Sequence, residues 1–190
     1  MAKSGEENKA SEQTNKQVDE YTFREGNISL ILDSYDDIFS DFDPRGYSER
    51  SLSDDFLAEC KKVARDKGEA LELRLMIPRR LRNVRDELKI KKRLKSHFHR
   101  HYLEKKEEIK SIKREGATWF VIGSMLMVIS TALYGKEDFF FKLLEVMLVP
   151  AAWFMFWEGL DKIFVTSRDK KPDYEFYRKM SQAQIFFLSY

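Results

Sequence analysis

Five aspartates stand close together between Asp33 and Arg45. Carboxylate oxygens suit hard divalent cations, and a loop after a strand of a parallel pair is where α/β folds bind ligands. A calcium-loop spacing from Asp41 fails, because Arg45 and Leu52 occupy two of its ligand positions. The alternative is a turn whose carboxylates pair with Arg45, Arg50 and a basic helix. The candidate ligand residues are Asp33, Asp36, Asp37, Asp41, Asp43 and Arg45.

Three further residues have the spacing of a metal site on one helical face. His97 and His101 are four positions apart, and Glu104 lies three positions beyond His101. Two imidazoles and a carboxylate are zinc ligands. Such a face without a further ligand is more typical of a basic, membrane-proximal surface. We therefore predict no bound metal and no cofactor.

Acidic residues also occur in and beside the second of two apolar segments, where Glu145, Glu158 and Asp161 accompany Pro150 and Trp157. A carboxylate in hydrocarbon is costly and usually faces protein or water. In a symmetric oligomer each acid forms a ring, and acidic rings favour cations. Pro150 is expected to kink its helix. The alternative is interfacial placement, with Glu145 paired to Lys142 and the inner acids paired to Lys162 or Arg168.

Catalytic motifs are missing from the sequence. It contains no glycine-rich phosphate loop, serine nucleophile elbow or Cys/His metal pattern. The single cysteine, Cys60, lies on the apolar face of a predicted helix, which favours a core position over a nucleophile. The sequence therefore predicts a protein that is not an enzyme, with an aspartate-bound metal enzyme as the least favoured hypothesis.

Two apolar segments predict a transmembrane hairpin at residues 117–160. Residues 117–134 form an uncharged run of 18, which spans ~27 Å as a helix, close to the hydrocarbon thickness of a bilayer. The second segment, 139–160, includes Lys142 and Glu145, and either spans or re-enters. The short link from Gly135 to Asp138 requires antiparallel neighbours. The alternative is a buried helix of a soluble protein.

The flanking charges predict the orientation. Residues 97–116 carry six Lys or Arg and residues 159–178 carry five. Under the positive-inside rule, both termini are cytoplasmic in a multi-pass protein of the plasma or inner membrane. Residues 79–116 form a long basic amphipathic helix, which we expect to contact anionic phospholipid headgroups rather than nucleic acid.

The remaining segments predict a small α/β domain. Residues 1–18 form a polar, disordered tail, and residues 19–78 form a βαβ unit with parallel strands at 27–33 and 70–77. A capping box from Ser51 to Asp54 opens its helix, which ends near Gly68. Residues 161–190 return as a helix from Pro172 and a strand over 184–190, which pairs with this sheet or with that of a neighbouring subunit.

The long helix is expected to begin near Arg80 and to continue into the first span, with or without a break near Gly116. Its buried stripe is predicted to start with Leu81, Val84 and Leu88 and to continue through Leu94, Phe98, Tyr102, Ile109 and Ile112.

Together these features predict an α+β membrane protein, with a two-helix hairpin inserted in or appended to a cytoplasmic α/β domain. The leading functional hypothesis is a homo-oligomeric channel or transport assembly in the lipid bilayer. The alternative is a membrane-anchored binding or signalling module that binds a ligand or partner at loop 33–45.

Overall fold

The computed structural model describes residues 27–65 and 72–190. The chain forms two compact units. Unit 1 contains Met1–Tyr102 and Phe176–Tyr190, and unit 2 contains Leu103–Glu175. The sequence of unit 2 is therefore inserted between the two parts of unit 1. The predicted tail at 1–18 and the predicted end of the first helix near Gly68 lie outside the described residues.

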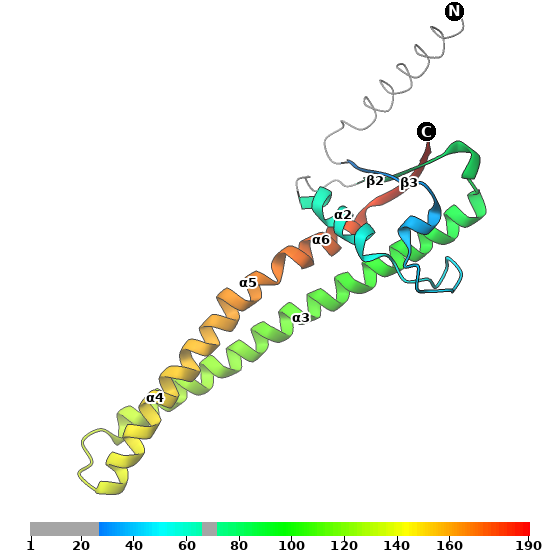
Figure 1. Cartoon of the computed structure of the whole chain (residues 1–190). Coiled ribbons are helices and arrows are strands. Elements are labelled where there is room, and N and C mark those ends of the chain that lie inside the picture. Colours follow the sequence, from blue (N-terminus) through cyan, green and yellow to red (C-terminus); the bar gives the residue numbers. More distant parts are fainter. Residues whose placement is uncertain (1–26, 66–71) are drawn as a thin grey trace, which may run out of the picture. The chain divides into compact units, whose positions relative to one another are not determined.

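Unit 1 contains a three-stranded parallel sheet in the order β1-β2-β3 (Figure 1). The strands are β1 (Asn27–Ile31), β2 (Glu72–Ile77) and β3 (Gln184–Ser189). The parallel pairing of the first two strands confirms that prediction. The third strand pairs with β2 within the same chain, so the sheet is completed without a neighbouring subunit. Its connection passes through the whole of unit 2.

One face of the sheet carries the core of unit 1. Alternate strand residues such as Leu73, Leu75 and Ile77 are fully buried there, as the period of a strand requires. Helix α2 (Asp54–Arg65), the start of α3 and helix α6 (Lys171–Gln182) contribute the rest of this core. Cys60 of α2 is part of it, and burial raises the pKa of its thiol to about 12. This burial fits a packing role.

Helix α3 runs without a break from Val84 to Leu133, preceded by a 3₁₀ turn, η2 (Arg79–Leu81). The predicted start of its buried stripe is wrong, because the side chains of Leu81, Val84 and Leu88 are exposed. At this end of the helix Glu87 and Ile90 face the core instead, and the predicted Leu94 and Phe98 follow them on the same face. Glu87 is tolerated there because its carboxylate accepts from Arg82 and Tyr35.

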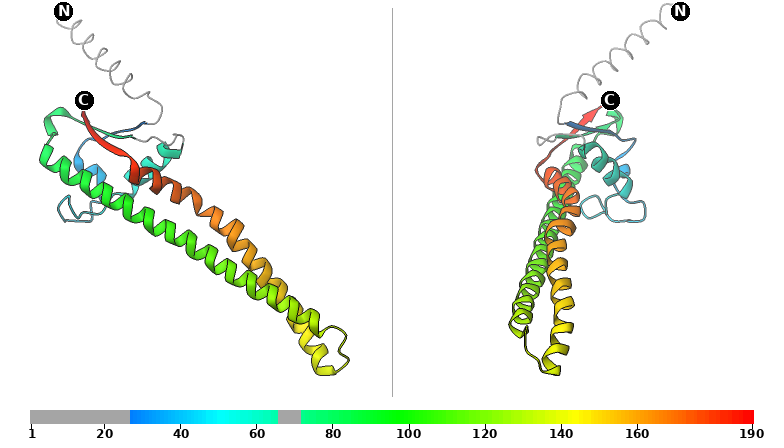
Figure 2. Two further views of the ribbon diagram at one scale, coloured as in Figure 1. Left: turned by 180° about the vertical axis from the view of Figure 1, so that it is seen from behind. Right: turned by 90° about the vertical axis from the view of Figure 1, so that its left-hand side faces the viewer.

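The hairpin of unit 2 pairs α3 with α4 (Phe139–Asp161), and the two lie side by side (Figure 2). Gly135 adopts a φ of +87° in the turn, a conformation that suits glycine. Helix α4 continues through Pro150 and then through a π-helical turn, η3 (Lys162–Thr166), and α5 (Ser167–Asp169). α3 and the stretch Phe139–Asp169 are both long and apolar enough to cross a membrane.

The predicted capping box at the start of α2 is wrong. The helix begins at Asp54, and Leu57 donates the first backbone hydrogen bond to the carbonyl of Ser53. Ser51 belongs instead to the preceding loop, where its amide donates to Asp43 and its carbonyl accepts from Ser40. A capping box of the same Ser-x-x-Asp pattern does occur at Ser34 and Asp37, where it starts the 3₁₀ turn η1 (Tyr35–Ile38).

Candidate functional site

The acidic segment of unit 1 ends in a closed loop over residues 40–51. Phe39 and Leu52 form an antiparallel bridge at its neck, and the amide of Ser40 donates to the carbonyl of Ser51 at 2.9 Å. The ring of Phe39 is buried and stacks on Tyr47 with centroids 5.3 Å apart. Arg93 of α3 donates to the carbonyl of Arg50 at 2.9 Å. The neck is therefore fixed to the body of unit 1.

Charged side chains hold the interior of this loop in one shape. Arg45 donates to both carboxylate oxygens of Asp43, at 2.9 and 2.7 Å, and the amide of Ser51 donates to the same carboxylate at 2.7 Å. The hydrogen bonds from Arg45 hold the pKa of Asp43 well below its usual 3.8. Arg50 bridges the carbonyl of Ser40 and the carboxylate of Asp36. These contacts correspond to the turn alternative for the acidic segment.

The carboxylate of Asp37 also binds the local backbone. One carboxylate oxygen of Asp37 accepts from the amides of Asp33 and Ser34, at 2.7 and 3.0 Å. Asp41 differs from the other aspartates, since its side chain is 91% exposed and its nearest cation, Arg50, is 3.8 Å away. Within the described residues no group of three potential metal ligands occurs. The five aspartates thus do not converge on a common point.

Phe42 lies in this loop, two residues after Ser40, and is 98% exposed. It is flanked by the exposed Asp41 and by Asp43, whose carboxylate is committed to Arg45 and Ser51. Phe39, only three residues earlier, is buried. Sequence reasoning missed Phe42 because it considered only the aspartates of this segment as candidate ligands. Only the closure of the neck separates the environments of the two rings.

A second polar cluster connects η1 with the start of α3. Glu87 is only 5% exposed and accepts from Arg82 at 2.8 Å and from the hydroxyl of Tyr35 at 3.1 Å. The Tyr35 hydroxyl in turn accepts from the amide of Asn83 at 2.9 Å. The hydrogen bonds from Arg82 lower the pKa of Glu87, and burial raises the pKa of Tyr35. This cluster is closed and stabilises the charged form of Glu87.

The histidines stack on neighbouring rings. His97 and His101 have ring centroids 4.3 Å apart, and His101 lies 5.2 Å from the ring of Tyr177 in α6. Glu104 belongs to unit 2. In the part of the chain that the structure describes, no metal-binding group of three includes these residues. Their contacts are those of a packed surface between α3 and α6.

In unit 2 the backbones of α3 and α4 are in close contact. A Cβ atom added to Gly123 would lie 2.5 Å from the amide nitrogen of Phe156, and one added to Gly159 would lie 2.5 Å from that of Phe120. Small residues recur every seven positions on each helix: Gly116, Gly123 and Ser130 on α3, and Ala152 and Gly159 on α4. We call this set of five residues the small-residue seam. The seven-residue spacing of these small residues is a sequence signal for close packing of the two helices.

Glu145 continues the small-residue seam one step further along α4, seven residues before Ala152. The same spacing places Ser130 of α3 at this level. Glu145 is half-buried, and among the described residues its carboxylate has no ion pair or hydrogen bond, including none with Lys142. It lies about 9 Å along α4 from Phe139. Glu145 is thus a carboxylate without a partner among the described residues, followed in α4 by the uncharged stretch from Val146 to Trp157.

The inner acids have partners. Glu158 lies 3.6 Å from Lys162, and Lys162 also pairs with Glu115 of α3. Asp161 accepts from the hydroxyl of Thr166 at 2.9 Å, across the π-helical turn. Trp157 is exposed and stacks on Trp153 with centroids 6.2 Å apart. For Glu158 the structure therefore shows the expected pairing with Lys162 rather than an unpaired acid.

The chain matches no protein-family model, no curated protein and no solved structure.

Proposed function

We propose that this protein is a membrane-tethered interaction module. The α3–α4 hairpin inserts into the plasma or inner membrane, both termini lie in the cytoplasm, and loop 40–51 presents Phe42 to a partner protein. The single observation that carries the proposal is Phe42, almost fully exposed on a loop whose shape is fixed by ion pairs and hydrogen bonds.

Insertion of the hairpin is supported by the distribution of its side chains. Only 17% and 6% of the most apolar stretches of the two helices are buried within the protein. Large apolar residues face outward, whereas the small-residue seam faces the other helix: outward side chains include Val121, Met125, Val128, Val146, Trp153 and Phe154. Helices that associate in lipid place small residues at their contact in this way. A core helix of a soluble protein would have the opposite arrangement.

The loop meets the requirements of a binding element. A loop whose backbone is already held in one shape loses little conformational freedom on association. Aromatic residues are also enriched among those that dominate binding energy. Because the exposed carboxylate of Asp41 flanks Phe42, the complementary surface is an apolar cleft with a cationic rim. The alternative of a metal ligand set at Asp33 to Asp43 has less support, since most of these carboxylates hold the loop itself.

Site-specific photo-crosslinking tests this proposal in native membranes. A photoreactive phenylalanine analogue replaces Phe42 in the full chain, and the same analogue replaces Val84, which is also exposed on unit 1. We expect a discrete adduct at position 42 that is absent at position 84 and weakened by Asp43→Ala, which frees the loop. Equal labelling at both positions would overturn the proposal.

A second function, an oligomeric cation path, is favoured by Glu145. An unpaired carboxylate within an apolar helix costs free energy unless a proton, a cation or a second subunit neutralises it. The small-residue seam leaves no path between the two helices of one chain, so a path requires several copies around it. Pro150 and Trp157 lie on the helix that would line it.

Stoichiometry and ion flux test the second function. In a lipid nanodisc, light scattering should show an oligomer, and Glu145→Gln should alter cation flux into liposomes. Glu137→Gln is the matched control, because Glu137 lies in the exposed turn and its loss also removes one carboxylate. A monomer, or equal flux in the two variants, would exclude this function.

A further inference from the structure

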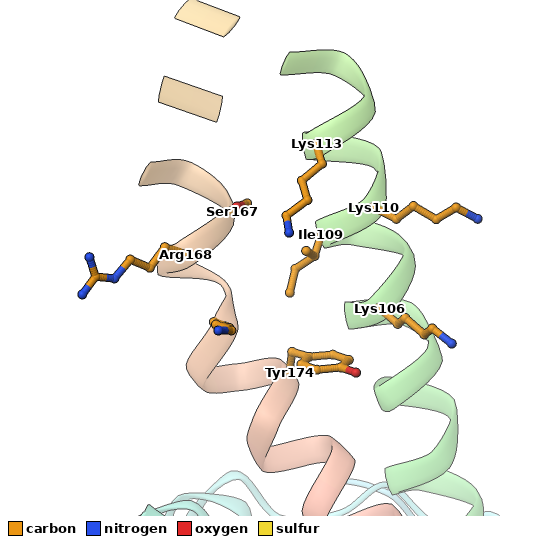
Figure 3. Close-up of a pocket in the computed structure, with 8 residues that line it drawn as sticks. Lys106, Ile109, Lys110, Lys113, Ser167, Arg168 and Tyr174 are labelled. Carbon is orange, nitrogen blue, oxygen red and sulfur yellow. The ribbon is translucent and has the colours of Figure 1, made fainter. Parts of the chain in front are cut away.

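A pocket of about 620 Å³ lies within unit 2, between α3 and the stretch from α5 to the start of α6 (Figure 3). Ile109, Lys113 and Tyr174 project into the gap between the two helices. The ring of Tyr174 closes one end of the gap, while Lys106, Lys110 and Arg168 extend outward from its edges. The pocket thus combines an apolar inner wall with a basic rim.

The charge of this pocket has one sign. Five of its eight lining residues are cationic and none is acidic: Lys106, Lys110, Lys113, Arg168 and Lys171. Within the described chain, Lys113, Arg168 and Lys171 have no ion-pair partner. Like charges held together repel one another, so such a cluster favours an anion between them.

Two carboxylates of α3 lie near this cluster, and they leave most of it unneutralised. Glu107 pairs with Lys110 of the lining at 3.7 Å, whereas Lys113, Arg168 and Lys171 have no ion pair within the described residues. Glu108 lies on α3 beside the pocket, and it accepts from Lys105 at 2.7 Å and pairs with Lys170 at 3.1 Å. The hydrogen bond from Lys105 is the main reason that the pKa of Glu108 is lowered. Glu108 therefore stays charged and committed to two lysines outside the pocket lining.

The position of the pocket along the chain matches the depth of lipid headgroups. Lys113 precedes the uncharged run that starts at Ala117 by four residues, or about 6 Å along the helix. The headgroup region of one leaflet is about 5–7 Å thick. If the hairpin is inserted, Lys113 lies among phosphates, whereas Lys106 lies on their aqueous side. At this depth the most abundant anion is the phosphate of a lipid headgroup, which favours it over a soluble phosphate as the ligand.

We infer that this pocket binds the phosphate headgroup of an anionic phospholipid, with Lys113 and Lys171 on the phosphate and Ile109 and Tyr174 against the glycerol backbone. The inference rests on insertion of the hairpin and is independent of the proposed role of Phe42. It converts the general expectation of a basic helix near lipid into one defined site.

Native mass spectrometry of the full chain, purified in detergent, tests this site. Phosphatidylglycerol and phosphatidylcholine serve as probes, and 10 mM inorganic phosphate serves as the soluble competitor. We expect one phosphatidylglycerol to be retained per chain, with no retention of phosphatidylcholine and no displacement by phosphate. Each surface-proximal cation contributes about fivefold to lipid affinity, so Lys113→Gln with Lys171→Gln should weaken retention about 25-fold.

Two further variants separate a pocket from a merely basic surface. Lys92→Gln with Lys95→Gln removes the same charge from exposed positions of α3 in unit 1 and should leave retention unchanged. Ile109→Trp keeps every charge but fills the inner wall, and it should reduce retention. Equal loss in both double variants, or equal retention of the two lipids, would overturn the site. Displacement by phosphate would assign it to a soluble anion instead.

Alkaline carbonate extraction of membranes separates failure of the site from failure of insertion. The variants should stay in the extracted membrane pellet with the unmodified chain. A protein that is extracted would contradict insertion itself. A chain that resists extraction but retains no phosphatidylglycerol would contradict only the headgroup site.

Discussion

Unit 1 and the hairpin of unit 2 hold their elements together by opposite means. Unit 1 buries large apolar side chains and satisfies its buried charge, so that Glu87 has Arg82 and Tyr35 as partners. The hairpin exposes its large apolar side chains, brings backbones together at Gly123 and Gly159, and leaves Glu145 unpaired. In water, burial of large groups drives packing, whereas in lipid close contact of small residues does so. The contrast supports the proposal that the hairpin lies in lipid.

Gly123→Leu should produce the largest loss of stability, because it removes the close helix contact that distinguishes the hairpin from unit 1. Because its Cβ would lie 2.5 Å from a backbone nitrogen, the helices must separate. We expect a loss of about 3 kcal/mol in the free energy of unfolding of the hairpin. Steric trapping in bicelles measures this quantity.

Gly46→Ala is the matched control, because a Cβ atom at Gly46 meets no neighbour within 4 Å. It should change stability by less than about 0.5 kcal/mol. A similar small effect of Gly123→Leu would show that the seam does not hold the hairpin.

Glu87→Gln tests the unit 1 side of the contrast. The charged carboxylate accepts hydrogen bonds from Arg82, and loss of that charge should cost about 2 kcal/mol at pH 7. The pKa of Glu87 is lowered from 4.5, so its folded form resists protonation. Its contribution is therefore complete above pH 4.5 and is lost as pH falls below that value towards the lower folded pKa.

Equilibrium unfolding of the full chain between pH 3 and pH 7 measures this effect, with tyrosine fluorescence reporting on unit 1. The Glu87→Gln variant should show a shallower loss of stability on acidification than the unmodified chain. Parallel pH profiles would contradict the assigned role of the Arg82 pair.

Asp37→Ala should have a smaller effect and sharpens the comparison within unit 1 itself. The carboxylate of Asp37 satisfies two backbone amides at the start of η1, and its removal should cost about 1 kcal/mol. Asp41→Ala removes the same charge from a nearly fully exposed side chain and should cost almost nothing. Chemical denaturation of the two variants gives the difference, and equal costs would argue against the capping role.

Much of the architecture follows from patterns along the chain. Alternating apolar residues gave the parallel strands β1 and β2, and the final apolar run gave β3. Two apolar runs and a four-residue link gave the hairpin. These predictions succeed because period and length are local properties. The buried face at the start of α3 was not predictable in the same way, since it includes the charged Glu87, whose partners Arg82 and Tyr35 are set by the tertiary structure.

For the candidate sites, too, some features were predictable from the sequence and others depended on tertiary contacts. The acidic segment, the basic helix and Glu145 were all identified as unusual from residue type alone. The roles of these residues were not identified, because each role depends on partners that are distant in the sequence. Asp43 is committed by Arg45 and Ser51, whereas Glu145 reaches no partner. Phe42 was missed because a ring's exposure depends on the closure of its loop.

The sequence by itself determined which segments are apolar enough to leave water and where the charge that stops them lies, because both are sums over neighbouring residues. Tertiary structure decided which small residues touch across the hairpin, which carboxylates are paired, and which lysines surround a common pocket. Those properties depend on contacts between residues distant in the sequence, such as Glu115 and Lys162. A pattern along the chain records such a contact only when both partners repeat at the same spacing, as the seam glycines do.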